Sequence, residues 1–271
     1  MVQERDSERV PRRSASRLER LQRVCRVVAG GRAGGGGESE RELHSCDYDA
    51  VRSLLLAPAA VFPPLADRFG IPLRLPHSGG VALTFDDGPH PEGTPAVLET
   101  LRAAGATATF FLVGEQVERH PALAAEIAAA GHEIALHGYR HTLLLRRTKR
   151  SLERDVDRAL DVIADASGRE PRCYRPPYGV FTTAALTLAR RRGWLPLLWS
   201  RWGRDWGPRE TPEKIARRAT TGLERGDVVL LHDADYYSSS GSWRRTVAAL
   251  PSILDAVAAL GVPCISVTQS T

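Results

Sequence analysis

Two aspartates stand side by side in the segment VALTFDDGPHP at residues 81–91. Asp86 and Asp87 follow a short apolar run and precede a Gly-Pro pair that breaks the chain. Adjacent carboxylates repel each other, and placing them at the end of a buried strand is costly unless a cation or a shared proton compensates. The pair therefore indicates either an ordinary turn, since Asp, Gly and Pro are turn residues, or a site that holds a cation.

Two histidines in the segment LHGYRH could complete such a site. His137 and His141 are four residues apart, which puts both rings on one side if the segment is helical. Two imidazoles and one carboxylate form a three-ligand site with open positions, suited to Zn²⁺ or a similar divalent ion. One aspartate can bind the ion while its neighbour acts as a base on a water that the ion activates. Taken alone, such a histidine pair is more typical of surface or capping residues.

Three further segments place reactive side chains directly after short apolar runs. Arg175 lies in YRPPYG, Asp205 and Trp206 lie in WSRWGRDW, and His232 lies in VVLLHD. In a parallel α/β barrel, reactive groups gather in the loops at the carboxyl ends of the strands. Acid, imidazole and guanidinium groups at five such strand ends favour one catalytic site over a series of unrelated turns.

The elements that must position these residues alternate regularly from Val81 onward. Helix starts are expected at Thr94-Pro95 and Thr211-Pro212, and helix ends at glycines such as Gly105. Seven parallel βα units predict a (β/α) barrel of seven or eight strands, with an open doubly wound sheet as the alternative. The expected strands are residues 81–85, 106–112, 132–136, 172–175, 195–199, 227–231 and 264–267.

Composition excludes several other classes of protein. The net charge of +5 is spread over arginines along all 271 residues, and no nucleic-acid-binding module accompanies it, so nucleic acid is not an expected partner. The four cysteines form no C-x-x-C pair, which argues against a thiolate metal site. The sequence contains no run of 18 or more apolar residues, so it predicts no membrane-spanning helix. No signal-peptide pattern follows Met1.

The chain divides into three parts by composition. Residues 1–46 are polar, arginine-rich and interrupted by glycines, and they predict a disordered tail. Residues 47–79 are more apolar but contain Pro58, Pro63 and Pro64, so we expect a partly ordered linker that packs on the main domain. Residues 80–271 form the predicted catalytic domain.

The motifs TFDDGP, HGYRH, RPPYG, RDW and LLHD, in this order, resemble those of the polysaccharide deacetylases. These are the metal-dependent carbohydrate esterases of family 4, related to the nodulation chitooligosaccharide deacetylases, and the resemblance covers about residues 80–268. It implies a distorted (β/α)7–8 barrel that hydrolyses N-acetyl groups of an amino-sugar polymer or oligomer, such as peptidoglycan or a chitin-like chain. It also implies one divalent metal ion, with Zn²⁺ expected and Co²⁺, Ni²⁺ or Mn²⁺ as alternatives.

Roles for the metal site and the base follow from the resemblance. Asp86 matches the catalytic base of the family. Asp87, His137 and His141 match its metal ligands. Arg175 matches the arginine that positions the base, and a fixed guanidinium keeps a neighbouring carboxylate ionised.

The resemblance also implies roles for five residues around the substrate. The backbone N–H of Tyr178 matches the donor to the oxyanion, and Trp206 and Leu230 match the apolar walls around the acetyl methyl group. His232 matches the general acid that protonates the departing amine. Asp205 matches the carboxylate that raises the pKa of this histidine.

Two positions depart from the family's pattern. Gly138 stands where a serine or threonine hydroxyl usually braces the ligand loop, so we expect this loop to be held differently. Trp202 stands where the fourth motif usually begins with an aspartate, and we expect this ring to line the substrate groove instead.

Two alternatives to polymer deacetylation remain open. The same site could hydrolyse an amide or ester of a small acetylated metabolite, or the protein could be a carbohydrate-binding relative without catalysis. The expected partner is an acetylated glycan, and the expected state is a monomer. A cell-wall substrate suggests a location in the cell envelope or outside the cell, whereas the missing signal-peptide pattern fits the cytoplasm, so the sequence leaves the location unknown.

Overall fold

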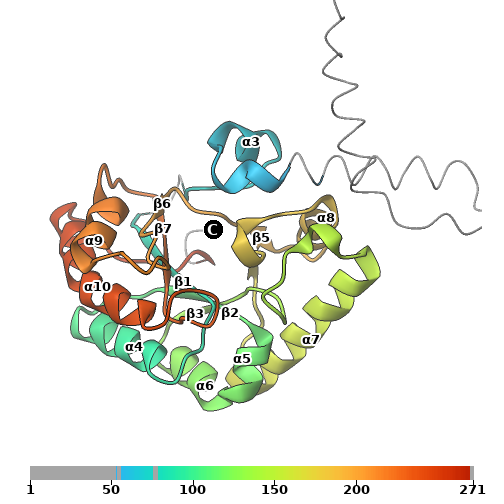
Figure 1. The fold of residues 1–271 in the computed structure, drawn as a ribbon, viewed down its shortest axis with the longest axis horizontal. Coiled ribbons are helices and arrows are strands. Elements are labelled where there is room, and N and C mark those ends of the chain that lie inside the picture. Colours follow the sequence, from blue (N-terminus) through green and yellow to red (C-terminus); the bar gives the residue numbers. More distant parts are fainter. Residues whose placement is uncertain (1–52, 54–55, 76–78, 269–271) are drawn as a thin grey trace, which may run out of the picture. The chain divides into compact units, whose positions relative to one another are not determined.

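The computed structural model describes residue 53, residues 56–75 and residues 79–268. The predicted tail at residues 1–46 lies outside the described residues, as does part of the predicted linker. The described residues form a curved parallel sheet whose outer side is covered by helices (Figure 1).

The sheet has seven strands in the order β5-β4-β3-β2-β1-β7-β6, and every neighbouring pair is parallel. Among the described strands no pairing joins β5 to β6, so the barrel is incomplete, and the prediction of a distorted (β/α) barrel is confirmed. The strands are β1 (Ala82–Asp86), β2 (Thr109–Leu112), β3 (Glu133–Leu136), β4 (Cys173–Tyr174), β5 (Leu195–Pro196), β6 (Arg201–Trp202) and β7 (Val228–His232).

One predicted strand is absent, and one observed strand was not predicted. Residues 264–267 do not form a strand, because only Cys264 makes an isolated parallel bridge, to Val81. The strand β6 was not predicted, since two residues are too few for a periodic pattern to indicate a strand. The other six predicted runs each overlap a strand, with β1 and β7 ending one residue later than predicted and the other four strands shorter than predicted.

Helices follow the strands as the alternating pattern predicts. They are α3 (Pro63–Arg68), α4 (Gly93–Ala103), α5 (Gly114–Arg119), α6 (Pro121–Ala129), α7 (Lys149–Ser167), α8 (Thr183–Arg191), α9 (Pro212–Thr220) and α10 (Ser242–Ala259). Short 3₁₀ turns lie at η1 (Ala57–Ala60), η2 (Leu144–Arg146) and η3 (Pro177–Gly179). No described helix is both long and apolar enough to cross a membrane.

The two predicted helix starts behave differently. Thr211 is the N-cap of α9, and its side chain accepts a hydrogen bond from the Lys214 N–H. Thr94 is not a cap, because α4 already begins at Gly93. Its hydroxyl instead accepts from the His90 N–H and donates to the buried carboxylate of Asp233, a contact across 139 residues that outweighs the local capping preference.

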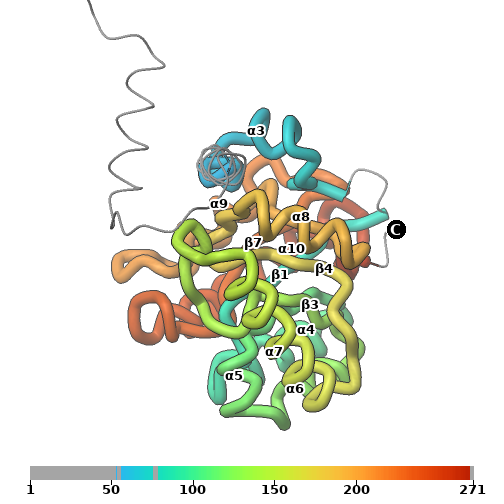
Figure 2. Tube along the Cα trace, turned by 90° about the vertical axis from the view of Figure 1, so that its right-hand side faces the viewer, coloured from blue at the N-terminus to red at the C-terminus, as the bar shows by residue number. Residues whose placement is uncertain are grey.

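Residues 56–75 pack against the open side of the sheet, where Figures 1 and 2 show α3. The Pro72 carbonyl accepts a hydrogen bond from the Leu198 N–H, just beyond β5, at 3.0 Å. The Leu75 N–H donates to the Gly226 carbonyl, just before β7, at 2.7 Å. Ile71 is buried, as is Leu75, so this segment connects the two sides of the barrel where strand pairing is missing.

Candidate active site

Side chains from four strands meet at the carboxyl end of the sheet. Asp86 is the last residue of β1, and its in-register neighbour His232 is the last residue of β7. His137 directly follows β3, and Arg175 directly follows β4. Because the carboxyl ends of parallel strands lie at one edge, this topology brings residues from distant motifs together.

The backbone at Asp87 explains how two neighbouring aspartates can face one site. Successive side chains of an extended strand point to opposite faces, so an extended Asp87 would point away from Asp86. Asp87 instead has a φ of 79°, in the left-handed region that aspartate tolerates better than most residues. The turn places both carboxylates next to His137, with oxygen-to-Nε2 distances of 3.9 Å for Asp86 and 3.4 Å for Asp87.

Asp87, His137 and His141 form a group that can hold a metal ion. Their ligand atoms all lie within 4.8 Å of one another. Oδ1 of Asp87 is 3.4 Å from Nε2 of His137 and 3.2 Å from Nε2 of His141. This oxygen is buried and has no hydrogen-bond partner among the described residues. An orphaned carboxylate oxygen facing two imidazole nitrogens fits a divalent ion that accepts nitrogen and oxygen ligands.

The protonation states of these residues also suit metal binding. Burial opposes ionisation of Asp87, but the nearby imidazoles of His137 and His141 and the charge of His232 outweigh it and hold its pKa well below the usual value. Nδ1 of His137 lies 2.7 Å from the Arg175 carbonyl oxygen and donates to it, which leaves Nε2 free to act as a ligand.

Asp86 is held by Arg175 and stays outside the group of ligand atoms. The guanidinium donates from Nη1 to Oδ1 of Asp86 at 2.7 Å and to the Thr84 hydroxyl at 2.9 Å. Arg175 is fully buried, and its Nη2 donates to the Leu198 carbonyl at 2.8 Å. One oxygen of Asp86 is therefore fixed and charge-compensated, while Oδ2 faces the ligands.

His232 and Asp205 form a second pair on the β7 side of the proposed ligands, in which Asp205 is buried and the His232 side chain is 13% exposed. Oδ1 of Asp205 accepts from Nδ1 of His232 at 2.7 Å, and Oδ2 accepts from the His232 N–H at 2.8 Å and from the Thr246 hydroxyl at 2.7 Å. Burial lowers the pKa of His232, but the charge and hydrogen bond of Asp205, with the charges of Asp87 and Asp86, outweigh it and raise this pKa to about 10.

The predicted apolar walls lie next to this pair. Trp206 is 38% exposed and lies edge-on to the His232 ring, with centroids 5.7 Å apart. Leu230 is buried two residues before His232, so both side chains point to the same face of β7. Trp202 stacks on Trp199 at 5.8 Å and contacts Trp206 at 5.6 Å, which extends the aromatic surface away from His232.

Tyr178 lies on the other side of the ligands, within η3. Its φ of 61° turns the backbone sharply, and its side chain is 56% exposed. The Tyr178 ring meets the His141 ring edge-on, with centroids 4.4 Å apart. The structure thus brings all the residues predicted for the site to one end of the sheet.

The ligand loop with Gly138 is held by backbone hydrogen bonds and by α7. The Gly138 and Tyr139 carbonyls accept from the Gly114 and Glu115 N–H groups, each at 2.9 Å. The Tyr139 N–H donates to Oδ2 of Asp155 at 3.0 Å. These contacts replace the hydroxyl that the sequence lacks at Gly138.

The sequence reasoning missed three residues that contact the site. Thr246 on α10 donates to Asp205, and Asp155 on α7 accepts from the ligand loop. Tyr237 stacks on the His141 ring. The tyrosine pair shortly after LLHD was a usable signal for Tyr237, because large aromatic rings in a loop after a reactive strand end are unusual. Nothing local distinguishes Thr246 or Asp155 from other helical polar residues.

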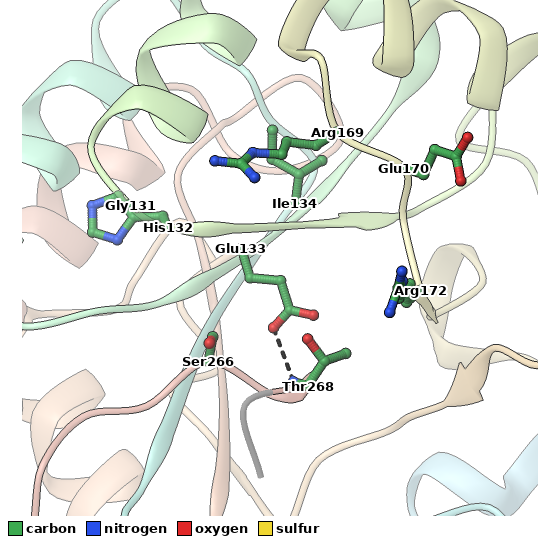
Figure 3. A pocket seen from close by; sticks show the side chains of 9 residues that line it. All are labelled: Gly131, His132, Glu133, Ile134, Arg169, Glu170, Arg172, Ser266 and Thr268. Carbon is green, nitrogen blue, oxygen red and sulfur yellow. Dashed lines mark hydrogen bonds between the residues drawn. The ribbon is translucent and has the colours of Figure 1, made fainter. Parts of the chain in front are cut away.

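A separate hollow of about 270 Å³ lies at the opposite end of β3 (Figure 3). His132 and Glu133 line it from the start of the strand, and Arg169 and Arg172 line it from the segment before β4. Glu133 is already engaged, since it accepts hydrogen bonds from the Thr109 hydroxyl and the Thr268 N–H. None of the predicted site residues lines this hollow, so the candidate active site is the group at the carboxyl ends.

Comparisons with known proteins agree with this geometry. The sequence profile described as polysaccharide deacetylase matches residues 76–195. A peptidoglycan-N-acetylglucosamine deacetylase of Bacillus cereus is 36% identical over 195 residues, which are 70% of this chain and 86% of that protein. A chitooligosaccharide deacetylase of Azorhizobium caulinodans is 33% identical over 194 residues, which are 68% of this chain and 91% of that protein.

A solved structure shows the same fold. The crystal structure of the Bc1960 peptidoglycan N-acetylglucosamine deacetylase is 28% identical and superposes with a TM-score of 0.66, covering 71% of this chain and 88% of that one. Residues 76–195 contain strands β1 to β4 and the motifs TFDDGP, HGYRH and RPPYG, whereas β6 and β7 lie beyond the matched range. The chain belongs to the polysaccharide deacetylase family.

Proposed function

We propose that this protein is a metal-dependent hydrolase that removes N-acetyl groups from an amino-sugar polymer or oligomer. Peptidoglycan and chitin oligomers are the candidate substrates, since the relatives named above are deacetylases of peptidoglycan and of chitooligosaccharides. The observation that carries the proposal is the position of Asp86. Its carboxylate is fixed by buried Arg175 beside the group formed by Asp87, His137 and His141, and is not itself one of that group.

The three ligand residues fit a single divalent ion, which we propose to be Zn²⁺. Such an ion, when bound, polarises the acetamide carbonyl and makes a water easier to deprotonate. Asp87 contributes an ionised carboxylate. Its Oδ1 accepts no hydrogen bond from the described residues and is therefore available to a metal ion. His137 contributes Nε2, because its Nδ1–H is committed to the Arg175 carbonyl.

Asp86 is the proposed general base. Oδ2 is the oxygen that faces the ligands and would accept the proton of the attacking water, while Arg175 holds Oδ1 at 2.7 Å. The guanidinium cannot take up this proton, since it is already fully protonated. Its buried contacts with Thr84 and Leu198 prevent it from turning away from the base.

His232 is the proposed general acid. Nδ1–H is bound to Asp205, so Nε2–H is the proton that can be delivered to the departing nitrogen. The carboxylate of Asp205 keeps the imidazole protonated before the amide bond breaks, which is the state that an acid requires. Cleavage of the carbon–nitrogen bond then yields acetate and a free amino sugar.

The remaining predicted residues would bind the acetyl group. We propose that the Tyr178 N–H donates a hydrogen bond to the oxyanion, a geometry for which the left-handed turn at this residue is suited. Trp206 and Leu230 would contact the methyl group from the side of His232. We further propose that the protein acts as a monomer, since every group in this scheme comes from one chain, and light scattering of the purified protein tests this.

The deciding experiment separates the base from the metal ligands. Acetate release is measured on peptidoglycan, chitin oligomers and N-acetylglucosamine, with and without a chelator, and metal content is measured by mass spectrometry. We expect Asp87→Ala to lose the metal and the activity. We expect Asp86→Asn to keep the metal and to lose turnover by about 10²-fold or more. Normal turnover of Asp86→Asn would refute the assignment of the base, and acetate release from none of the glycans would refute the proposed function.

A further inference from the structure

The two histidines of the proposed metal site are oriented in different ways. His137 has a hydrogen bond from Nδ1 to the Arg175 carbonyl, the usual way in which a ligand histidine is fixed. Nδ1 of His141 is buried and has no hydrogen-bond partner among the described residues. Some other contact must therefore fix the orientation of the His141 ring.

Tyr237 makes that contact. Its ring stacks on the imidazole of His141 with centroids 4.1 Å apart and an angle of 11° between the planes. The edge of Tyr178 contacts the same imidazole at 4.4 Å, with an angle of 62°. A ring held by a parallel face and by an edge cannot rotate freely about its side-chain bonds without losing both contacts.

The hydroxyl of Tyr237 is fixed in turn by two side chains of α5. It accepts from the Gln116 amide nitrogen at 3.0 Å and donates to Oε1 of Glu115 at 2.9 Å. Gln116 is almost fully buried, and its own oxygen accepts from Arg119 at 3.2 Å. The tyrosine ring is therefore held at both its stacked face and its polar end.

The same turn of α5 also holds the loop that carries His141. The N–H groups of Gly114 and Glu115 donate to the carbonyls of Gly138 and Tyr139. One short helix therefore sets both the position of the ligand loop and the position of the ring that stacks on the ligand. This double attachment distinguishes Tyr237 from an aromatic residue that merely fills space.

We infer that Tyr237 is a positioning residue that orients the imidazole of His141 for metal binding, in place of the Nδ1 hydrogen bond that this histidine lacks. Tyr237 comes from the loop after β7, the strand that carries His232. The inference rests on the proposed metal site but is independent of which glycan is the substrate.

The test compares metal affinity among variants of the full-length protein. Tyr237→Leu removes the stacked ring, and Tyr237→Phe keeps the ring but removes both hydroxyl contacts. Tyr236→Leu is the matched control, because the Tyr236 ring lies in the same loop and contacts His90 and Tyr237, with centroids 5.1 and 6.2 Å apart, but makes no ring contact with His141 among the described residues. The Kd for Zn²⁺ is measured by competition with a chromophoric chelator, and the visible spectrum of the Co²⁺-loaded protein reports the geometry around the ion.

We expect Tyr237→Leu to raise the Kd for Zn²⁺ by about 10- to 100-fold and to alter the Co²⁺ spectrum, the size of effect that is typical of groups that orient ligands. Tyr237→Phe should raise the Kd measurably but by less than about tenfold, and Tyr236→Leu should bind Zn²⁺ like the wild type. Wild-type affinity and an unchanged Co²⁺ spectrum in Tyr237→Leu would overturn the inference.

Two further variants keep the test decisive. If Tyr237→Leu does not fold by circular dichroism, Glu115→Ala replaces it, since this change removes one hydroxyl contact and leaves the backbone hydrogen bond intact. Unchanged Zn²⁺ affinity in Glu115→Ala and in Tyr237→Phe together would then overturn the inference. Asp87→Ala is titrated in parallel, because wild-type Zn²⁺ affinity in that variant would refute the metal site itself rather than the role of Tyr237.

Discussion

Replacing Asp205 with asparagine removes the charge beside His232 and leaves the shape of the side chain almost unchanged. The carboxylate accepts hydrogen bonds from Nδ1 and the N–H of His232 and from the Thr246 hydroxyl. An asparagine has only one acceptor oxygen, so it cannot accept all three. In addition, it no longer stabilises a positive charge on the imidazole.

The size of this effect follows from the pKa of His232. Burial lowers this pKa, but Asp205 is the largest of the influences that outweigh burial and raise it from 6.5 to about 10. A change of this size corresponds to about 5 kcal/mol of stability. Because the folded-state pKa lies above the unfolded value, this stability is fully present below about pH 6.5 and is lost as the pH rises through about 10.

We therefore expect Asp205→Asn to destabilise the metal-free protein by about 2–3 kcal/mol more at about pH 6 than at about pH 10.5. The measurement is urea unfolding of wild type and variant at both pH values in the presence of a chelator. Asp165→Asn on the exposed side of α7 is the control, and it should change stability by less than about 0.5 kcal/mol at either pH. Deacetylation by Asp205→Asn should fall by about 10²–10⁴-fold.

Equal destabilisation by Asp205→Asn at the two pH values would refute this reasoning. It would mean that the charge of Asp205 does not hold the proton on His232, and the assignment of His232 as the acid would lose its physical basis. Loss of activity alone would not decide the matter, because a distorted site is also inactive.

Three other substitutions test single contacts. Arg175→Met leaves the buried carboxylate of Asp86 without its partner and should lower the free energy of unfolding by about 3–5 kcal/mol in urea titrations; a loss below about 1 kcal/mol would contradict the buried ion pair. Gly114→Val places a Cβ 2.8 Å from Cδ2 of Tyr139 and should lower the free energy of unfolding by about 1–3 kcal/mol in the same titrations. An unchanged unfolding midpoint would show that the Tyr139 ring can move to make room for the new side chain. If the Trp202 ring lines the groove, Trp202→Ala should raise KM for a long oligomer about three- to tenfold and leave KM for a short one unchanged. KM values equal to those of the wild type for both oligomers would mean that Trp202 only packs against its neighbours and does not contact the substrate.

Much of the fold could be predicted because its signals are local. Strands β1 and β7 are buried along most of their length, and their apolar runs indicate this directly. The helical spacing of Leu152, Val156, Leu160 and Ile163 predicts an apolar face on α7. The structure buries all of them except Leu160, which is partly buried against the core. The two-residue strand β6 escaped detection, since its pairing with β7 depends on a neighbour 28 residues away and not on any pattern of its own.

The candidate site was predictable in part for a similar reason. Each reactive residue follows a strand, and parallel strands have their carboxyl ends at one edge, so convergence of the motifs is a consequence of topology. The contacts that hold these residues are different in kind. Thr246 binds Asp205, which is 41 residues away in the sequence, and Tyr237 binds Gln116, which is 121 residues away. Neither contact can be predicted from the residues that are neighbours in the sequence.

By itself, the sequence determined which residue types stand at the strand ends, and therefore the kind of chemistry that is available. Only the tertiary structure decided the direction of each group. The left-handed turn at Asp87 brings two neighbouring carboxylates to one face, and Arg175, 89 residues from Asp86, binds one oxygen of Asp86, the proposed base. The physical reason is that strand and helix patterns depend on neighbours along the chain, whereas side-chain orientation in a buried polar site depends on partners that only folding brings within hydrogen-bond distance.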